Sequence, residues 1–236
     1  SVERHLGRET LDGFRIVFGT RVLRAIAVVV FSAMLFAVVP EGLAAAWAVD
    51  LASSKVDRGW IQGVIMMAGP TGFILGGVII GRLVRPDLRR RLIQPFAVLA
   101  PLALVAAFLK PSVVPLAIMV ALCGFAVAGM MPAANGLFVQ ALPAGYRARA
   151  FGVMQSGVQV MQGVAVLATG VLADQFDIPT VVGGWSLAGV LLLGIIWLRW
   201  PSSGAVAEAI SAATAESAAP APRPGRHRPG PVEAPV

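Results

Sequence analysis

The chain has 236 residues, of which 57% are hydrophobic and only 13% are charged. Soluble domains have about 45–50% apolar and about 25% charged residues, so this composition excludes a soluble enzyme and a disordered regulator. One Cys and two His likewise exclude a disulfide-rich domain and leave no ligand set for a metal or cofactor. The charges are mostly basic, with a formal net charge of +7, and together these values indicate a membrane protein.

Six apolar runs are long enough to cross the roughly 30 Å hydrocarbon core of a bilayer. We predict helices at residues 25–49, 60–80, 92–109, 112–142, 150–173 and 180–198. Glu41 is the only Asp, Glu, Lys or Arg within these runs. The runs predict an all-α membrane protein with six transmembrane helices.

The basic residues lie mostly on one side of the predicted membrane. Sixteen of the 19 fall on the side that holds both termini, the loop at 81–91 and the loop at 143–149, and three fall on the other. An excess of Lys and Arg marks the cytoplasmic side, so we expect both termini in the cytoplasm and the spans in the inner (plasma) membrane. Nucleic-acid binding is not expected, because the basic residues alternate with spans instead of sharing one accessible face.

The composition divides the chain into three parts. Residues 1–24 read as a cytoplasmic amphipathic lead-in, the end of a central loop, and residues 25–200 as the transmembrane domain. Residues 201–236 are rich in Ala and Pro and lack an apolar period, so we predict a disordered cytoplasmic tail.

Polar residues within the spans follow a repeating pattern. The first and second spans contain several, the third few, the fourth and fifth several, and the sixth few. This pattern predicts two inverted three-helix repeats, each with two lining helices and one lipid-facing helix. In the second span, Gly72-x-x-x-Gly76 and Gly77-x-x-x-Gly81 would let helix backbones approach closely.

Three segments carry a resemblance to a known family. The segment Leu-Asp-Gly-Phe-Arg at 11–15 looks like the end of the central cytoplasmic loop that joins the two halves of a twelve-helix transporter. Residues 143–152 look like the loop before the eleventh helix of such a protein and the start of that helix. At 81–91, Gly81, Arg89 and Arg90 match a degenerate inner-loop signature, although Arg85 occupies its Asp position and Leu88 its second Gly position. With six spans, residues 9–200 resemble the C-terminal half of a major facilitator superfamily transporter.

The resemblance implies a half bundle that forms one wall of a central cavity. It implies secondary active transport of a small molecule by alternating access, as in a permease, and we expect a proton-coupled exporter or antiporter. The missing N-terminal six-helix half would belong to the same parent chain or, in the alternative, to a second copy. Gly81, Arg89 and Arg90 would take part in gating, or Arg89–Arg91 would anchor the topology and attract anionic lipid.

Glu41 is the first candidate for the transport path. Pro40 cannot donate to the helix ladder and Gly42 weakens it, so we expect the helix to kink or unwind beside this carboxyl. Ionisation at that depth carries a desolvation cost, which makes proton binding possible near neutral pH. Glu41 would therefore couple protons or bind substrate; alternatively, it is a hydrated carboxylate at a cavity mouth or a cap on a broken helix.

Four amide side chains are the next candidates. Gln155, Gln159 and Gln162 are spaced i, i+4 and i+7, so they share one helix face, and Asn135 could join them from the fourth span. Neutral amides donate and accept hydrogen bonds without a charge penalty, as a polar substrate or a water path requires. The alternative is that they only form hydrogen bonds between helices.

The alternative to a transporter is a non-transporting six-helix scaffold or a channel-like assembly subunit. An enzyme is not expected, because the spans contain no Ser/His pair, paired Asp or His-x-x-x-His arrangement.

Overall fold

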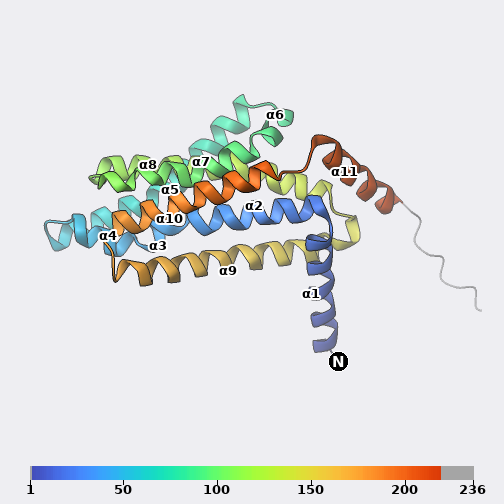
Figure 1. The fold of residues 1–236 in the computed structure, drawn as a ribbon, viewed down its shortest axis with the longest axis horizontal. Coiled ribbons are helices and arrows are strands. Elements are labelled where there is room, and N and C mark those ends of the chain that lie inside the picture. The colour runs from blue at the N-terminus through green and yellow to red at the C-terminus, as the bar shows by residue number, and fades with distance from the viewer. Residues whose placement is uncertain (1, 219–236) are drawn as a thin grey trace, which may run out of the picture.

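A computed structural model describes residues 2–218, with side chains from residue 11 onward. All regular elements in this range are helices: α1 (Val2–Gly19), α2 (Arg21–Ala37), α3 (Val39–Gly42), α4 (Ala44–Leu51), α5 (Lys55–Leu83), α6 (Pro86–Arg91), α7 (Ile93–Val105), η1 (Ala106–Leu109), α8 (Val113–Gln140), η2 (Ala144–Tyr146), α9 (Arg147–Ala173), α10 (Ile178–Leu198) and α11 (Ser203–Ala218). The long helices run side by side, while α1 crosses one end of the bundle (Figure 1). The prediction of an all-α fold is confirmed.

The helices form six spans. Five are long and apolar enough to cross a membrane: Arg21–Gly42, Lys55–Leu83, Val113–Gln140, Ala144–Ala173 and Ile178–Leu198. The remaining one, Ile93–Leu109, comprises α7 and η1. Its 13 α-helical and four 3-10 residues extend for roughly 28 Å, close to the thickness of the hydrocarbon core. The first and fourth spans run in opposite directions, as inverted three-helix repeats require (Figure 1).

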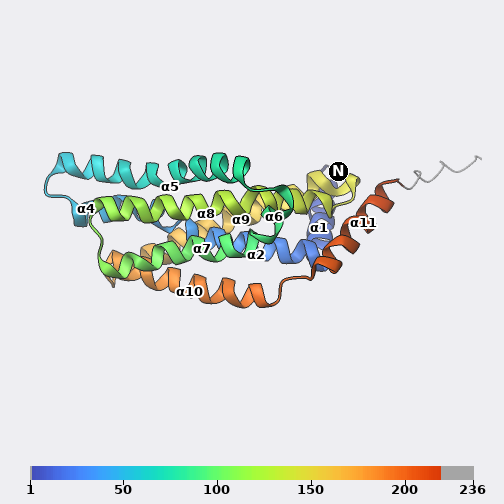
Figure 2. The ribbon, with the colours of Figure 1, turned by 90° about the horizontal axis from the view of Figure 1, so that it is seen from above.

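One end of the bundle is basic. The starts of α2, α7 and α9 and the ends of α5, α8 and α10 meet there, and we call it the basic end (Figures 1 and 2). Its described basic side chains are Arg15, Arg21, Arg24, Arg82, Arg85, Arg89, Arg90, Arg91, Arg147, Arg149 and Arg199. Lys55, Arg58 and Lys110 lie at the opposite end. The basic side chains at positions 4, 8, 223, 226 and 228 fall outside the described side chains.

The first span is broken, as the sequence predicts. Val38 separates α2 from α3, and Leu43, with φ −100° and ψ 3°, separates α3 from α4. Pro40 has no N–H to donate to the carbonyl four residues before it, so the hydrogen-bond ladder is interrupted at this point. Close to the break, the Trp185 indole of α10 donates to the Leu35 carbonyl at 2.9 Å.

Glycines bring α5 and α8 into backbone contact. A β-carbon on Gly72 would collide with the carbonyl of Ala121, and one on Gly76 would lie 2.9 Å from the Ala128 methyl group. The two helices lie side by side in Figure 2. The other predicted pair, Gly77 and Gly81, faces open space instead. Glycine spacing alone therefore does not show which pair of glycines makes a close helix contact, because that depends on which face of the helix meets a neighbouring helix.

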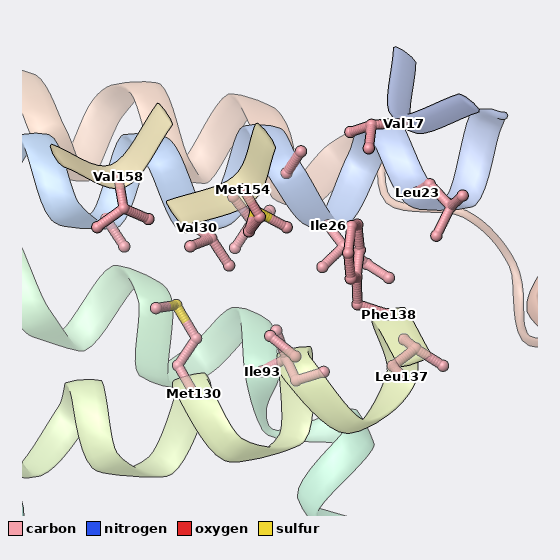
Figure 3. Packing of buried hydrophobic residues seen from close by; sticks show 14 of the residues in the cluster. Val17, Leu23, Ile26, Val30, Ile93, Met130, Leu137, Phe138, Met154 and Val158 are labelled. Atoms are coloured by element: carbon pink, nitrogen blue, oxygen red, sulfur yellow. The ribbon is translucent and has the colours of Figure 1, made fainter. Parts of the chain in front are cut away.

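Two hydrophobic clusters fill the bundle. The cluster nearer the basic end includes Ile26 and Val30 of α2, Phe138 of α8 and Met154 of α9 (Figure 3). Phe138 also meets Phe151 edge to face, with ring centroids 5.6 Å apart. The second cluster, towards the opposite end, is centred on these buried side chains: Trp47, Ile65, Leu104 and Leu116.

The predicted amphipathic lead-in is the helix α1. It lies across the spans (Figure 1) and packs closely on α9. A β-carbon on Gly13 would lie only 3.0 Å from the carbonyl oxygen of Arg149. Asp12 and Arg149 form an ion pair at 3.9 Å. Leu11 and Phe14 remain 57% and 49% exposed, an orientation that suits a helix at the membrane surface.

The expectation of a disordered tail is wrong for Ser203–Ala218, which form α11. This stretch is rich in Ala, the best helix former, and contains no Pro between Pro201 and residue 220. The Ser202 hydroxyl accepts a hydrogen bond from the backbone N–H of Ala205 at 3.3 Å near the start of the helix. Near its end, the Ser217 hydroxyl accepts one from the N–H of Ala144 at 3.1 Å. Residues 219–236 lie outside the described part of the chain, so disorder there stays a prediction.

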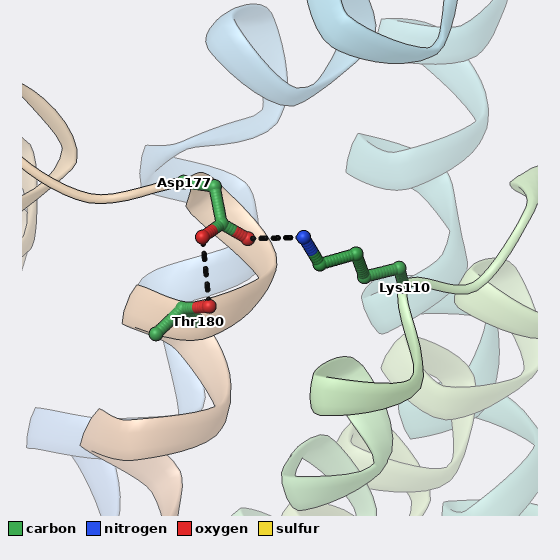
Figure 4. A network of polar contacts seen from close by, with 3 residues as sticks. All are labelled: Lys110, Asp177 and Thr180. Atoms are coloured by element: carbon green, nitrogen blue, oxygen red, sulfur yellow. Dashed lines mark hydrogen bonds and ion pairs between the residues drawn. The ribbon is translucent and has the colours of Figure 1, made fainter.

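An ion pair joins two loops at the opposite end of the bundle. Lys110 Nζ lies 3.4 Å from Asp177 Oδ2, and the Thr180 hydroxyl donates to Asp177 Oδ1 at 2.9 Å (Figure 4). The Thr180 hydrogen bond, and then the charge of Lys110, hold the pKa of Asp177 below its ordinary value.

We expect Gly72→Ala to destabilise the protein by about 1–3 kcal/mol, because the new methyl group would push α5 away from α8. Thermal unfolding in detergent measures this change. Gly77→Ala is the matched control, since nothing lies within 4 Å of its added β-carbon. Equal melting temperatures for the two variants would contradict the backbone contact.

We expect Asp177→Asn to lower the melting temperature at neutral pH and to have no effect in acid. A carboxyl whose pKa is lowered by folding stabilises the folded state fully when the pH is above its unfolded-state pKa, which is about 3.9 for Asp. This stabilisation is lost as the pH falls through the folded-state pKa. The measurement is thermal unfolding of both proteins between pH 7 and about pH 2, so that the series extends below the lowered pKa of Asp177. A difference that persists at the acidic limit would be inconsistent with the titration of Asp177.

Candidate functional site

Two cavities on one face of the bundle form a continuous groove. Their volumes are about 380 Å³ and about 570 Å³, and they share Met34, Phe73, Val127 and Gln162. We call this combined cavity the polar groove. Its residues belong to α2, α3, α5, α8 and α9 and to the Val38 break, and none comes from α7 or α10. This distribution is the one that the repeating polar pattern predicts.

Glu41 lies in the part of the groove that is farther from the basic end. Its Oε1 atom is 2.8 Å from the position that a β-carbon on Gly69 would occupy. The glycine in α5 therefore leaves the space that the carboxylate of α3 fills. Pro70 and Cys123 line the same cavity, so the broken helix places its carboxyl opposite a Pro-containing segment of α5.

The four predicted amides line the groove towards the basic end. Gln155, Gln159 and Gln162 project from one face of α9, and Asn135 projects from α8 beside Pro132. Within residues 11–218, none of these four side chains makes a hydrogen bond. By contrast, Thr71 and Thr169 donate to carbonyls of their own helices, each at 2.7 Å. The groove amides thus keep their donors and acceptors available for water or a ligand.

All five residues predicted for the transport path line this one groove, but three apolar residues of its wall were not predicted from the sequence. Met34, Phe73 and Val127 lie at the junction of the two cavities. Each is an apolar residue in an apolar span, and such a residue gives no sequence signal that separates a groove wall from a core or a lipid-facing surface. Phe73 is 41% exposed, whereas Met34 is buried.

The inner-loop residues lie away from the groove, at the basic end. The Arg89 guanidinium donates to the Gly81 carbonyl at 2.6 Å and to the Val84 carbonyl at 2.8 Å. These bonds satisfy carbonyls at the C-terminal end of α5, where a cation also interacts favourably with the helix dipole. Arg90 donates to Gln140 Oε1 at 2.8 Å, which joins α6 to the last turn of α8.

The part of the chain that the structure describes contains no group of three His, Cys, Asp or Glu side chains that could hold a metal ion. Glu41 and Cys123 do line the same cavity. The groove therefore offers one carboxylate, several amides and apolar walls, which suit the binding of a small amphipathic molecule.

Six apolar spans, four of which line a polar groove on one face, define a multi-pass membrane protein of the transporter class. Residues 21–229 match the Major Facilitator Superfamily, and because the match covers most of the chain, the protein belongs to this family. Neither the curated proteins nor the solved structures compared with the sequence gave a match. The members of this family are membrane transporters, typically without enzymatic activity, that lie in a lipid bilayer and transport small molecules.

We expect Arg89→Gln to destabilise the protein by about 1 kcal/mol, because the carbonyls at the end of α5 lose a charged donor. Thermal unfolding measures the change. Arg85→Gln is the control in the same loop and removes an equal charge, and within the described residues Arg85 makes no such bond. If the two variants lost the same stability, net charge rather than helix capping would be responsible.

Proposed function

We propose that this protein performs secondary active transport and moves a small molecule by alternating access along the polar groove. The observation that carries the proposal is the gathering of Glu41, Asn135, Gln155, Gln159 and Gln162 in one groove. Polar side chains inside a membrane are costly and tend to mark substrate or ion paths. Amides without partners supply the hydrogen bonds that such a path needs.

Protons are the proposed coupling ion, and Glu41 is their binding site. The carboxyl lies inside the first span, where the ionised form is costly, and it faces a cavity through which protons can reach it. The break at Pro40 gives this segment a hinge. Protonation removes the cost of the charge, so the groove can close around Glu41 in its neutral form. Exchange of protons for substrate makes the protein an antiporter, and we assign it to efflux.

The substrate is proposed to be amphipathic. Met34, Phe73 and Val127 supply an apolar wall between the carboxyl and the amides. Flexible Met side chains adapt to ligands of different shape. A neutral or cationic compound with one apolar face fits this arrangement, and Glu41 would attract a cation when it is ionised.

A second six-helix half is proposed to close the groove. The groove is formed by one half bundle and is open on one side, and α9 leaves apolar side chains exposed beside it, including Val160 and Val164. The N-terminal half of the same parent chain would cover this face. The excess of Arg at the basic end supports a cytoplasmic location for that end and insertion in the plasma membrane.

The basic-end residues are proposed to act in gating. Gly81 and Arg89 are linked at the end of α5, and Arg90 connects this loop to Gln140 of α8. Rocking of the half bundle would change the distance between these helix ends and the opposite half. The Arg90 bond would then keep α5, α6 and α8 moving as one unit.

We expect Glu41→Gln to abolish flux driven by a pH gradient while the protein still folds and binds substrate. The full parent transporter is reconstituted in liposomes, and uptake is measured with and without an imposed gradient. Asp50→Asn is the matched control, because Asp50 lies in α4 outside the groove. Unchanged pH-driven flux in Glu41→Gln would disprove proton coupling through this residue. If the unaltered protein showed no flux at all for a broad panel of amphipathic compounds, the scaffold alternative would be favoured.

We expect Gln159→Ala to raise KM about fivefold with little change in stability. The loss of one hydrogen bond to substrate costs about 1 kcal/mol, which corresponds to this change in affinity. Val160→Ala is the neighbouring control, because Val160 is 57% exposed and does not line the groove. Equal KM values for the two variants would remove Gln159 from the substrate path.

A further inference from the structure

A second cavity, separate from the polar groove, lies at the basic end. It has a volume of about 750 Å³ and is lined by residues of α6, α7, α8, α10 and α11. We call it the basic-end cavity. It shares no residue with the polar groove. The proposed transport function therefore leaves this cavity unexplained.

The buried amide of Gln94 points to a ligand in the basic-end cavity. This residue is only 3% exposed, and neither its Nε2 nor its Oε1 atom has a hydrogen-bond partner among the described residues. Buried polar atoms are nearly always hydrogen-bonded, so an amide with both ends unsatisfied beside a cavity requires a partner inside it. The partner must offer an acceptor to Nε2 and a donor to Oε1.

The charges around Gln94 select an anion. Arg90 and Arg91 line the cavity together with one acid, Asp87. Arg90 uses one Nη2 bond to Gln140, and Arg91 makes no ion pair or hydrogen bond within the described side chains. Two guanidinium groups and one carboxylate leave a net charge of +1, which suits a monoanion. Arginine is also the side chain best shaped for phosphate oxygens.

The rest of the wall favours a lipid over a free ion. Trp197 near the end of α10, Trp200 just beyond that helix, and Val206 and Ile210 of α11 supply the apolar lining. Tryptophan is enriched where a membrane protein meets the headgroup region. The cavity adjoins α7 and α10, the two helices that contribute nothing to the polar groove. A ligand with a phosphate at one end and an apolar body fits both halves of this wall.

We propose that the basic-end cavity binds the headgroup of an anionic phospholipid beneath α11. Arg90, Arg91 and the Gln94 Nε2 atom bind the phosphodiester oxygens. A headgroup hydroxyl donates to Gln94 Oε1. The glycerol backbone and the first acyl carbons lie against the tryptophans and the apolar face of α11.

The test compares phosphatidylglycerol, phosphatidylcholine and inorganic phosphate as additives to the purified full protein in detergent. Thermal unfolding and native mass spectrometry measure stabilisation and retained lipid. We expect phosphatidylglycerol alone to raise the melting temperature and to stay bound. An equal effect of inorganic phosphate would show a free-anion site, and an equal effect of phosphatidylcholine would show a general bilayer effect. Either result would overturn the proposal.

Variants separate this site from the general charge of the basic end. We expect Arg91→Gln and Gln94→Leu each to weaken phosphatidylglycerol binding about tenfold, whereas Arg85→Gln, which removes an equal charge outside the cavity, leaves binding unchanged. Without lipid, Gln94→Leu should keep or raise the melting temperature, because it removes an unsatisfied amide, and this result would show that the variant folds. Unchanged lipid binding in both cavity variants, or an equal loss in Arg85→Gln, would overturn the proposal.

Discussion

Hydrocarbon offers no hydrogen bonds to a polar side chain, and this constraint determines where the polar groups of the six spans lie. Some satisfy themselves within their own helix, as Thr71 and Thr169 do through backbone carbonyls. Glu41 and four amide side chains gather in the polar groove, where Glu41 lies at one end and Gln155 at the other. The helices that face away from the groove, α7 and α10, contribute nothing to it. The groove face thus holds most of the amide side chains of the spans and their one carboxyl, and that face is the natural path for a polar substrate.

Two local features of the backbone give the groove its shape. Gly72 and Gly76 of α5 and Gly124 of α8 let the two helices approach closely, and Gly69 leaves room for the Glu41 carboxylate. Pro40 interrupts the first span at the residue before this carboxyl. The tight α5–α8 contact is suited to motion as one rigid unit, whereas the broken span can change its angle. A rigid wall beside a hinge is the arrangement that alternating access requires.

Much of the fold follows from the sequence because hydrophobic length, charge placement and Pro each act locally. The six spans, the break beside Glu41 and the shared face of Gln155 and Gln159 are of this kind. Features that depend on a neighbouring helix are not local. The sequence gives Gly77 the same spacing as Gly72, yet only Gly72 meets α8. Gln94 also looks unremarkable in an apolar span, since its burial without a partner arises only when α7, α10 and α11 come together. The helix α11 was not predicted, because the composition of residues 201–236 was considered as a whole. The Pro residues at its two ends outweighed the Ala-rich, helix-forming stretch between them.

Water accessibility of the groove face is the most direct test that these polar side chains line a transport path. Cys123 is the single cysteine of this chain, so single cysteines can be introduced at positions 155, 159, 160 and 164 after it, and any cysteine in the rest of the parent transporter, is replaced with Ser. The full transporter in membranes is then treated with a charged thiol reagent. Cysteines at 155 and 159 should react, and substrate should protect them, while those at 160 and 164 should stay unlabelled. Equal labelling at all four positions, or no protection by substrate, would contradict a path along the polar groove.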